Sequence, residues 1–151
     1  MNSSLSELQQ GIRLKKICVI DGQGGGIGAA IIKKLKQVYE ETVEIIALGT
    51  NAIATSQMLK ARANKGATGE NAIIHTVQQV DVILGPMAVI LANAMMGEVT
   101  PAMAAAISGS RARKIFLPLS RENIEIVGAP DIPLPHLIDL MVDEHLKKMS
   151  L

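Results

Sequence analysis

The feature that most constrains the fold of this chain is a glycine-rich stretch that joins a short apolar run to an amphipathic helix. Residues 17–20 are apolar, and five of the seven positions from Gly22 to Gly28 are glycine. After them, apolar residues recur at helical spacing to residue 38. A buried strand, a glycine turn and a helix are typical of the first βαβ unit of a dinucleotide-binding fold, where backbone N–H groups approach a phosphate at the helix N-terminus. The stretch therefore predicts where a ligand lies, but not the chemistry done on it.

The composition excludes several classes of function. The formal charge of +1 is nearly balanced, which argues against a nucleic-acid partner or an anionic membrane surface. The two aromatic residues, Tyr39 and Phe116, leave little for stacking on bases or on a flavin ring. The single cysteine, Cys18, excludes a disulfide framework and a thiolate-rich metal site. We therefore expect no nucleic acid, no membrane and no metal.

The longest apolar run covers residues 82–96, which is shorter than the about 20 residues that a membrane span needs. It predicts a strand followed by a helix over residues 87–96 that is apolar on most of its faces. Such a helix lies either at the centre of a fold or under another subunit, and we expect a homo-oligomer. No charged-then-apolar leader opens the sequence, so the expected location is cytoplasmic.

The pattern along the chain predicts an N-terminal extension, residues 1–14, and one Rossmann-like α/β domain, residues 15–151. The predicted strands are residues 17–20, 43–48, 81–84, 114–117 and 124–127. The predicted helices are residues 26–39, 51–63, 70–79, 87–96 and 101–109, with a final helix that Pro133 and Pro135 open. Residues 64–71 are polar and contain two glycines, which indicates a loop.

The last predicted strand has a consequence for the sheet. Only residues 118–123 separate it from the strand before it, and so short a link cannot make a parallel crossover. We therefore expect residues 124–127 to run antiparallel at the sheet edge. The predicted fold is a three-layer Rossmann-like α/β sandwich with a mixed sheet of about five strands, mostly parallel.

In such a sheet, a ligand binds at the carboxyl ends of the parallel strands, near the switch in strand order. The loops that reach this edge supply the candidate ligand-binding residues: Asp21, Gly22, Gln23, Gly24, Gly25, Gly26, Ile27, Gly28, Thr50, Asn51, Gly85, Pro86 and Arg121. Asp21 either shapes the glycine loop through backbone hydrogen bonds or acts on a ligand hydroxyl or proton. Arg121 is either a carboxylate or phosphate clamp or a solvated turn residue.

The identity of the cofactor stays open between a nucleotide and NAD(P). Residues 24–29 fit the G-x-G-x-x-G/A fingerprint, yet the second strand ends in Gly49-Thr50-Asn51, without the acid that would bind a ribose hydroxyl. Short-chain dehydrogenase chemistry needs Tyr-x-x-x-Lys, and Tyr39 is followed four residues on by Val43. A P-loop is excluded because no Gly-Lys-Ser/Thr ends the glycine run. The alternative for the glycine loop is a tight turn that serves only to pack helix against strand.

Seven segments share a resemblance to one family. They are residues 20–28, 46–51, 66–72, 85–86, 91–98, 123–128 and 133–136. They resemble an uncharacterised family of small, mainly anaerobic-bacterial Rossmann-like proteins that is known only as a domain of unknown function. The resemblance covers nearly everything from Lys16 onward, and since members are usually shorter at the N-terminus, it supports the reading of residues 1–14 as an extension. It implies no established activity.

Three hypotheses for function follow. The first is a homo-oligomeric protein that binds a nucleotide or another phosphorylated small molecule at the glycine loop. The second is a small enzyme whose site is completed at a subunit interface, with Asp21, Glu70 and Arg121 as acid, base or clamp. The third is a structural or regulatory oligomer without a small-molecule ligand, which associates through residues 87–96.

Overall fold

The computed structural model describes residues 13–120 and 122–151. The expected N-terminal extension lies almost wholly outside these residues. The described strands are β1 (Lys15–Asp21), β2 (Val43–Gly49), β3 (Lys65–Thr68), β4 (Val82–Pro86) and β5 (Arg113–Leu117). The helices are α2 (Gly26–Tyr39), α3 (Ala52–Lys60), α4 (Glu70–Thr76), α5 (Pro101–Gly109) and α6 (Leu134–Asp139). A 3₁₀ turn, η1 (Met87–Ile90), follows β4, and α6 continues through a π-helical segment, η2 (Leu140–Leu146), into a last 3₁₀ turn, η3 (Lys147–Met149).

The strands form one parallel sheet in the order β3-β2-β1-β4-β5. Ile17 of β1 pairs with Ile45 of β2 on one side and with Val82 of β4 on the other. The strand order changes direction between β1 and β4, and at such a switch point the loops that follow two neighbouring strands diverge and leave a crevice. The topology therefore places a crevice beside the glycine loop that follows β1.

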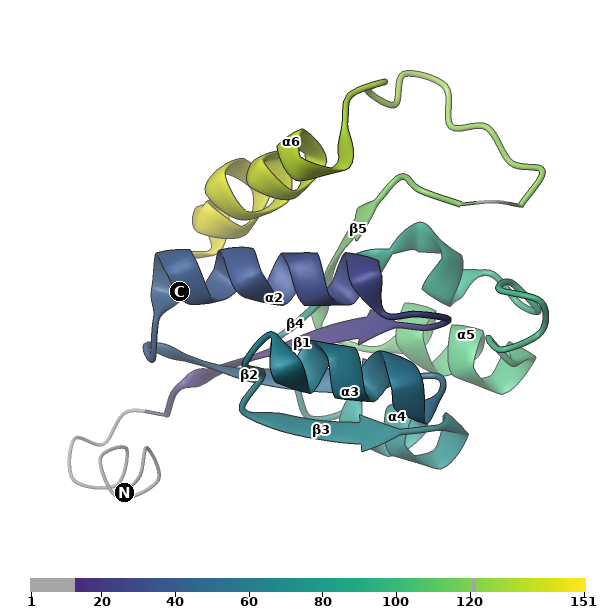
Figure 1. Ribbon diagram of the computed structural model, residues 1–151, viewed down its shortest axis with the longest axis horizontal. Coiled ribbons are helices and arrows are strands. Elements are labelled where there is room, and N and C mark those ends of the chain that lie inside the picture. Colours follow the sequence, from purple (N-terminus) through teal and green to yellow (C-terminus); the bar gives the residue numbers. More distant parts are fainter. Residues whose placement is uncertain (1–12, 121) are drawn as a thin grey trace.

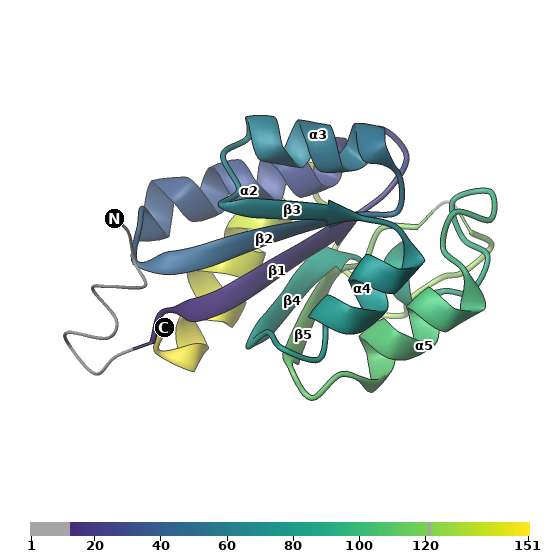
Figure 2. The same ribbon diagram turned by 90° about the horizontal axis from the view of Figure 1, so that it is seen from below.

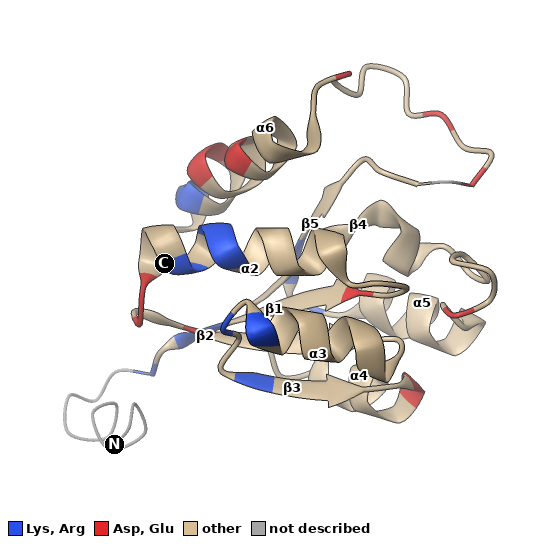
Figure 3. Cartoon of the chain, in the orientation of Figure 1, with Lys and Arg blue, Asp and Glu red and all other residues tan. Residues whose placement is uncertain are grey.

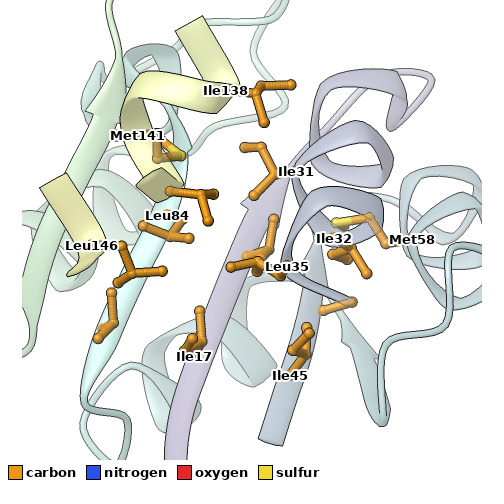
Figure 4. Packing of buried hydrophobic residues seen from close by; sticks show 14 of the residues in the cluster. Ile17, Ile31, Ile32, Leu35, Ile45, Met58, Leu84, Ile138, Met141 and Leu146 are labelled. Atoms are coloured by element: carbon orange, nitrogen blue, oxygen red, sulfur yellow. The ribbon is translucent and has the colours of Figure 1, made fainter. Parts of the chain in front are cut away.

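Helices cover both faces of the sheet, as the two views in Figures 1 and 2 show, so the predicted three-layer arrangement is confirmed. Side chains of β1 alternate between the two cores because successive residues of a strand point to opposite faces. Ile17 and Val19 belong to the core under α2, α3 and α6, whereas Cys18 and Ile20 belong to the core under α4 and α5. Figure 4 shows Ile31 and Leu35 of α2 between the sheet and the C-terminal helical segment.

Helix boundaries follow local chemistry. The predicted helix over residues 26–39 is confirmed, and the Asn51 side chain caps α3 by accepting a hydrogen bond from the Ala54 N–H at 2.9 Å. Thr100 caps α5 in the same way, with Pro101 at the first helical position. Among helices within residues 13–120 and 122–151, none has the length and apolar character needed to cross a membrane.

The predicted antiparallel edge strand is wrong. Residues 124–127 form no strand, and Ile124, Ile126 and Val127 are exposed on a long loop that leads from β5 to α6. The fifth strand is instead β3, which pairs in parallel with β2 within the segment that the sequence indicated as a polar loop. A short, exposed edge strand lacks the apolar alternation by which strands are recognised. Residues 124–127 have that alternation but find no neighbouring strand to pair with.

The predicted helix over residues 87–96 is also wrong. The chain forms the short turn η1 and then a series of turns over residues 92–98. Asn93, Met95 and Met96 adopt left-handed backbone conformations, with φ of 67°, 57° and 57°, and a right-handed helix cannot continue through such residues. In this compact segment, residues 91–98, Met96 is almost fully exposed and Met95 lies beside the glycine loop.

Candidate functional site

A pocket of about 400 Å³ lies at the carboxyl ends of β1, β4 and β5. The glycine loop forms one wall, and the residues that follow β4 and β5 form the others. The lining residues are Asp21, Gly22, Gln23, Gly24, Gly25, Gly26, Ile27, Pro86, Ala88, Met95, Leu119, Ser120 and Glu122. The pocket is therefore at the switch point that the sheet topology creates.

The side chain of Asp21 holds the glycine loop in its conformation. One carboxylate oxygen, Oδ1, accepts a hydrogen bond from the Gly22 N–H at 2.8 Å, and Oδ2 accepts one from the Gly28 N–H at 2.7 Å. Burial raises the pKa of Asp21, and the hydrogen bonds from Gly28 and Gly22 oppose this effect without cancelling it. With both oxygens engaged by the loop, Asp21 has the geometry of a shaping residue, the first of its two predicted roles.

Packing requires glycine at Gly25 and at Gly28, on the side of the loop that faces α3. Gly25 has a left-handed backbone, with φ of 75°, and a Cβ there would lie 2.7 Å from the Cα of Ala54. A Cβ on Gly28 would lie 2.6 Å from the sulfur of Met58. Both glycines therefore allow α2 and α3 to approach the loop, whether or not a ligand binds.

Gly24 and Gly26 have no such reason to be glycine. A Cβ on either would meet no atom within 4 Å, and neither residue has a positive φ. Both line the pocket, and neither amide donates a hydrogen bond to any described residue. Gly26 is also the first residue of α2, where the N–H groups carry the positive end of the helix dipole. The wall of the pocket thus contains two backbone donors that bind no described residue.

Four of the predicted site residues lie beside the pocket but do not line it: Gly28, Thr50, Asn51 and Gly85. Gly28 is buried, and Gly85 lets β4 pack against β1, since a Cβ there would lie 2.4 Å from the carbonyl oxygen of Ile20. Thr50 and Asn51 point toward Glu98 rather than toward the pocket. Arg121 lies outside the described residues.

Glu98 is the polar residue that the sequence interpretation missed. Its Oε1 accepts hydrogen bonds from the Gln23 N–H at 2.8 Å, the Thr50 hydroxyl at 2.7 Å and the Asn51 side-chain amide at 2.9 Å. Burial raises the pKa of Glu98, but these three donors outweigh it and hold the pKa below its usual range. Only its place in the segment 91–98, which carried the family resemblance, could have drawn attention to it.

The lining residues Met95, Leu119 and Glu122 were missed for a related reason. Met95 was assigned to a helix that does not exist, and Glu122 was assigned to a short link before an edge strand. In the structure the two segments meet, because the Glu122 carboxylate accepts a hydrogen bond from the Met95 N–H at 3.2 Å. No local pattern indicates this contact between residues 27 positions apart.

Glu70, the remaining candidate catalytic residue, and the charged residues of α2 and the C-terminal helix do not line the pocket. Glu70 accepts a hydrogen bond from the Thr100 hydroxyl and does not line the pocket. Lys34 of α2 contacts the carboxylates of Asp139 and Asp143 at 3.2 Å and 3.0 Å, and Figure 3 shows this opposition of basic α2 and acidic C-terminal helix. Within the part of the chain that the structure describes, no three His, Cys, Asp or Glu side chains gather in a way that could hold a metal ion.

Comparisons with known proteins identify the family but no activity. The family described as "Domain of unknown function (DUF3842)" matches residues 16–150. Among curated proteins, none matches the chain. One similar solved structure is a universal stress protein in complex with cAMP, with 14% identity and a TM-score of 0.41, covering 69% of this chain and 97% of that chain. Another is a dodecameric FMN-dependent UbiX-like decarboxylase from Escherichia coli O157:H7, with 14% identity and a TM-score of 0.45, covering 91% of this chain and 95% of that chain. At this identity neither similarity bears on function.

Proposed function

This chain belongs to the DUF3842 family, and from the pocket itself we propose that it binds a nucleotide or another phosphorylated small molecule. The phosphate lies against the glycine loop, where the N–H groups of Gly24 and Gly26 donate to its oxygens. The rest of the ligand occupies the space between the loops that follow β4 and β5.

The observation that carries the proposal is the difference among the loop glycines. Gly25 and Gly28 are explained by packing, whereas Gly24 and Gly26 are not. Gly24 and Gly26 line the pocket, and close approach of a ligand to the backbone is a reason for glycine that fits a pocket wall. A turn that served only to pack helix against strand would leave these two glycines unexplained.

The pocket wall carries negative charge that backbone amides partly offset. Two carboxylates line it, but both oxygens of Asp21 accept loop amides and one oxygen of Glu122 accepts the Met95 amide. Hydrogen bonds from N–H groups offset part of the negative charge of each. A phosphate or carboxylate clamp by Arg121 stays a prediction from the sequence.

The remaining walls suit an organic group. Ile27, Pro86, Ala88, Met95 and Leu119 supply apolar surface, while the Ser120 hydroxyl and the Glu122 carboxylate supply the polar contacts. A volume of about 400 Å³ is within the range of roughly 300–1,000 Å³ that small-molecule pockets occupy. An anionic end and a partly apolar body are the features of a nucleotide or a similar phosphate ester.

The proposal is tested by thermal-shift assays with and without Mg²⁺ on the wild-type protein and Gly26→Ala. The panel contains NAD, NADP, FMN, ATP, GTP, coenzyme A and sugar phosphates. A ligand at 100 times its dissociation constant stabilises the wild type by about 2.7 kcal/mol, which raises the melting temperature clearly. The alanine methyl group meets no protein atom within 4 Å but stands on the wall of the pocket, so Gly26→Ala folds normally and loses the ligand.

Two further variants make the test specific. Gly109→Ala, at the end of α5, also adds a methyl group into open space but far from the pocket, and it keeps ligand binding. Gly25→Ala places a side chain on a left-handed backbone and is destabilised by at least about 1–2 kcal/mol. A ligand that stabilises Gly26→Ala as much as the wild type would refute the proposed site.

The proposal includes self-association. Met96, Ile124, Ile126 and Val127 are exposed apolar side chains, which together we call the apolar rim. They lie on the two segments that the hydrogen bond between the Met95 N–H and Glu122 joins beside the pocket. A second copy of the chain that covers the rim would also border the ligand.

A further inference from the structure

The end of β2 is closed by a hydrogen-bonded bridge from a distant part of the chain. Segment 91–98 crosses from β4, and the Glu98 carboxylate at its end binds the hydroxyl of Thr50 and the side-chain amide of Asn51, both of which directly follow β2. The same oxygen accepts the Gln23 N–H of the glycine loop, and the Asn51 amide also donates to the Gln23 carbonyl at 3.0 Å. The loops after β1, β2 and β4 are thus joined at one point.

The bridge leaves no free space over the first glycine of the loop. A Cβ on Gly22 would lie 2.4 Å from the Thr50 hydroxyl oxygen, 2.5 Å from the Met95 sulfur and 3.0 Å from Oε1 of Glu98. Segment 91–98 therefore packs directly onto Gly22. The pocket opens only on the other side of the loop, toward β4 and β5, and neither Thr50 nor Asn51 lines it.

This division of the crevice determines the size of ligand it admits. A dinucleotide spans the crevice of a Rossmann-type sheet, with its phosphates on the glycine loop and the ribose of one half at the end of the second strand. Here the protein itself fills that half. We infer that the site takes a phosphate ester of about the size of one nucleotide and that the bridge made by Glu98 excludes dinucleotides. This inference rests on the proposed function, since it concerns the same phosphate position.

The charge of Glu98 acts in the same direction as its bulk. Burial raises the pKa of Glu98, but its three hydrogen-bond donors lower the pKa by more than burial raises it. Glu98 is therefore a carboxylate at neutral pH. Its three hydrogen-bond donors are neutral groups, and the charged group that acts on it is the Asp21 carboxylate, whose pKa the Glu98 charge helps to raise. A second phosphate or a 2′-phosphate at the end of β2 would therefore meet a negative charge as well as a filled space.

The test compares mononucleotides with the dinucleotides built from them. Isothermal titration is carried out with AMP, NMN and FMN as one set and with NAD and FAD as the other. In the wild type, at least one mononucleotide binds roughly 100-fold more tightly than the dinucleotide that contains it. In Glu98→Ala the bridge is lost and the end of β2 opens, so the dinucleotide gains affinity and the ratio falls to within roughly tenfold.

Two controls separate this inference from the proposed function. Glu98→Gln keeps an acceptor oxygen for Thr50 and Asn51 and retains the discrimination, which shows that the bridge and not the carboxylate alone is responsible. Gly26→Ala weakens every probe. Equal affinities for both sets in the wild type, abolished by Gly26→Ala, would overturn the size inference while the proposed function stands. No binding of any probe, or binding unchanged in Gly26→Ala, would overturn both. Circular dichroism and melting curves establish that each variant is folded.

Discussion

Asp21 and Glu98 show how single carboxylates organise the loop around the pocket. Asp21 holds the loop from within, since its two oxygens accept the amides at both ends of the seven-residue stretch from Gly22 to Gly28. Glu98 holds it from outside, through the Gln23 amide and the residues after β2. Between these two anchors, Gly24 and Gly26 line the pocket, and their N–H groups donate no hydrogen bond to any described residue.

At the residue scale, Asp21→Asn tests the first anchor. An asparagine offers one acceptor oxygen in place of two, so one buried loop amide is left facing an NH₂ group. We expect a loss of about 1–3 kcal/mol in the free energy of unfolding at pH 7, measured by urea denaturation. Two kinds of variant serve as comparisons for effects of shape alone. Asp21→Glu keeps the carboxylate, and a substitution of the exposed Gln23 side chain leaves Asp21 unchanged.

The pH dependence of the same variant gives a second measurement. Burial raises the pKa of Asp21 in the folded protein, so the folded state holds its proton more strongly than the unfolded state. This contribution to stability is present at low pH and is lost as the pH rises from about 4 through the folded pKa. The difference in the free energy of unfolding between the wild type and Asp21→Asn should therefore vary with pH in this window. A difference that stays constant from pH 3 to pH 8, a range of roughly 5 pH units, would contradict the assigned shift.

At the scale of elements, the C-terminal helical segment completes the core. Leu137, Ile138, Met141, Val142 and Leu146 are buried against α2 and the sheet, as Figure 4 shows for three of them. The ion pairs of Lys34 with Asp139 and Asp143 are solvent-exposed and contribute little. The segment is therefore held by apolar burial, and it covers the part of the sheet that α2 and α3 leave open.

Leu146→Ala tests this assignment, with Ile53→Ala as the matched control. Leu146 is fully buried, and its truncation should lower the free energy of unfolding by about 2–5 kcal/mol. Ile53 is 66% exposed on α3, and its truncation should change the free energy by no more than about 0.5 kcal/mol. Both values come from chemical denaturation followed by circular dichroism. Equal effects would mean that the C-terminal segment does not belong to the core.

At the scale of the whole molecule, the pocket lies where two halves of the sheet meet. The strands β3, β2 and β1 form one half, β4 and β5 the other, and each half sends a loop to the pocket. The apolar rim lies on the segments that follow β4 and β5, of which Met95 and Glu122 line the pocket. Exposed apolar side chains that gather at a functional edge mark interaction surfaces in soluble proteins.

We predict that the rim mediates self-association. Wild-type protein at roughly 100 μM should have the mass of a dimer or a larger assembly in light scattering coupled to gel filtration. The double variant Met96→Asp, Val127→Asp places charges on two almost fully exposed positions, so it should dissociate without unfolding. A wild type that is monomeric at this concentration would refute the prediction.

The local part of the fold was determined by the sequence alone. The first strand, the glycine turn, helix 26–39 and helix 101–109 were predicted because each depends on residues within one or two turns of chain. The position of the crevice was also predicted from the sequence. Strands that alternate with helices along the chain form a parallel sheet, and the ligand site of such a sheet lies at the carboxyl ends of its strands.

The tertiary structure decided whatever depends on contacts between distant residues. Edge strand β3 is recognised only by its pairing with β2. Residues 124–127 have the sequence pattern of a strand, but they form none because no strand pairs with them. The Glu98 bridge joins residues 75 positions apart, and the contact of Glu122 with Met95 joins residues 27 apart. No periodicity encodes such contacts, because they are chosen by how the whole chain packs. The same packing explains glycine at Gly25 and Gly28 and leaves Gly24 and Gly26 without a contact that requires it.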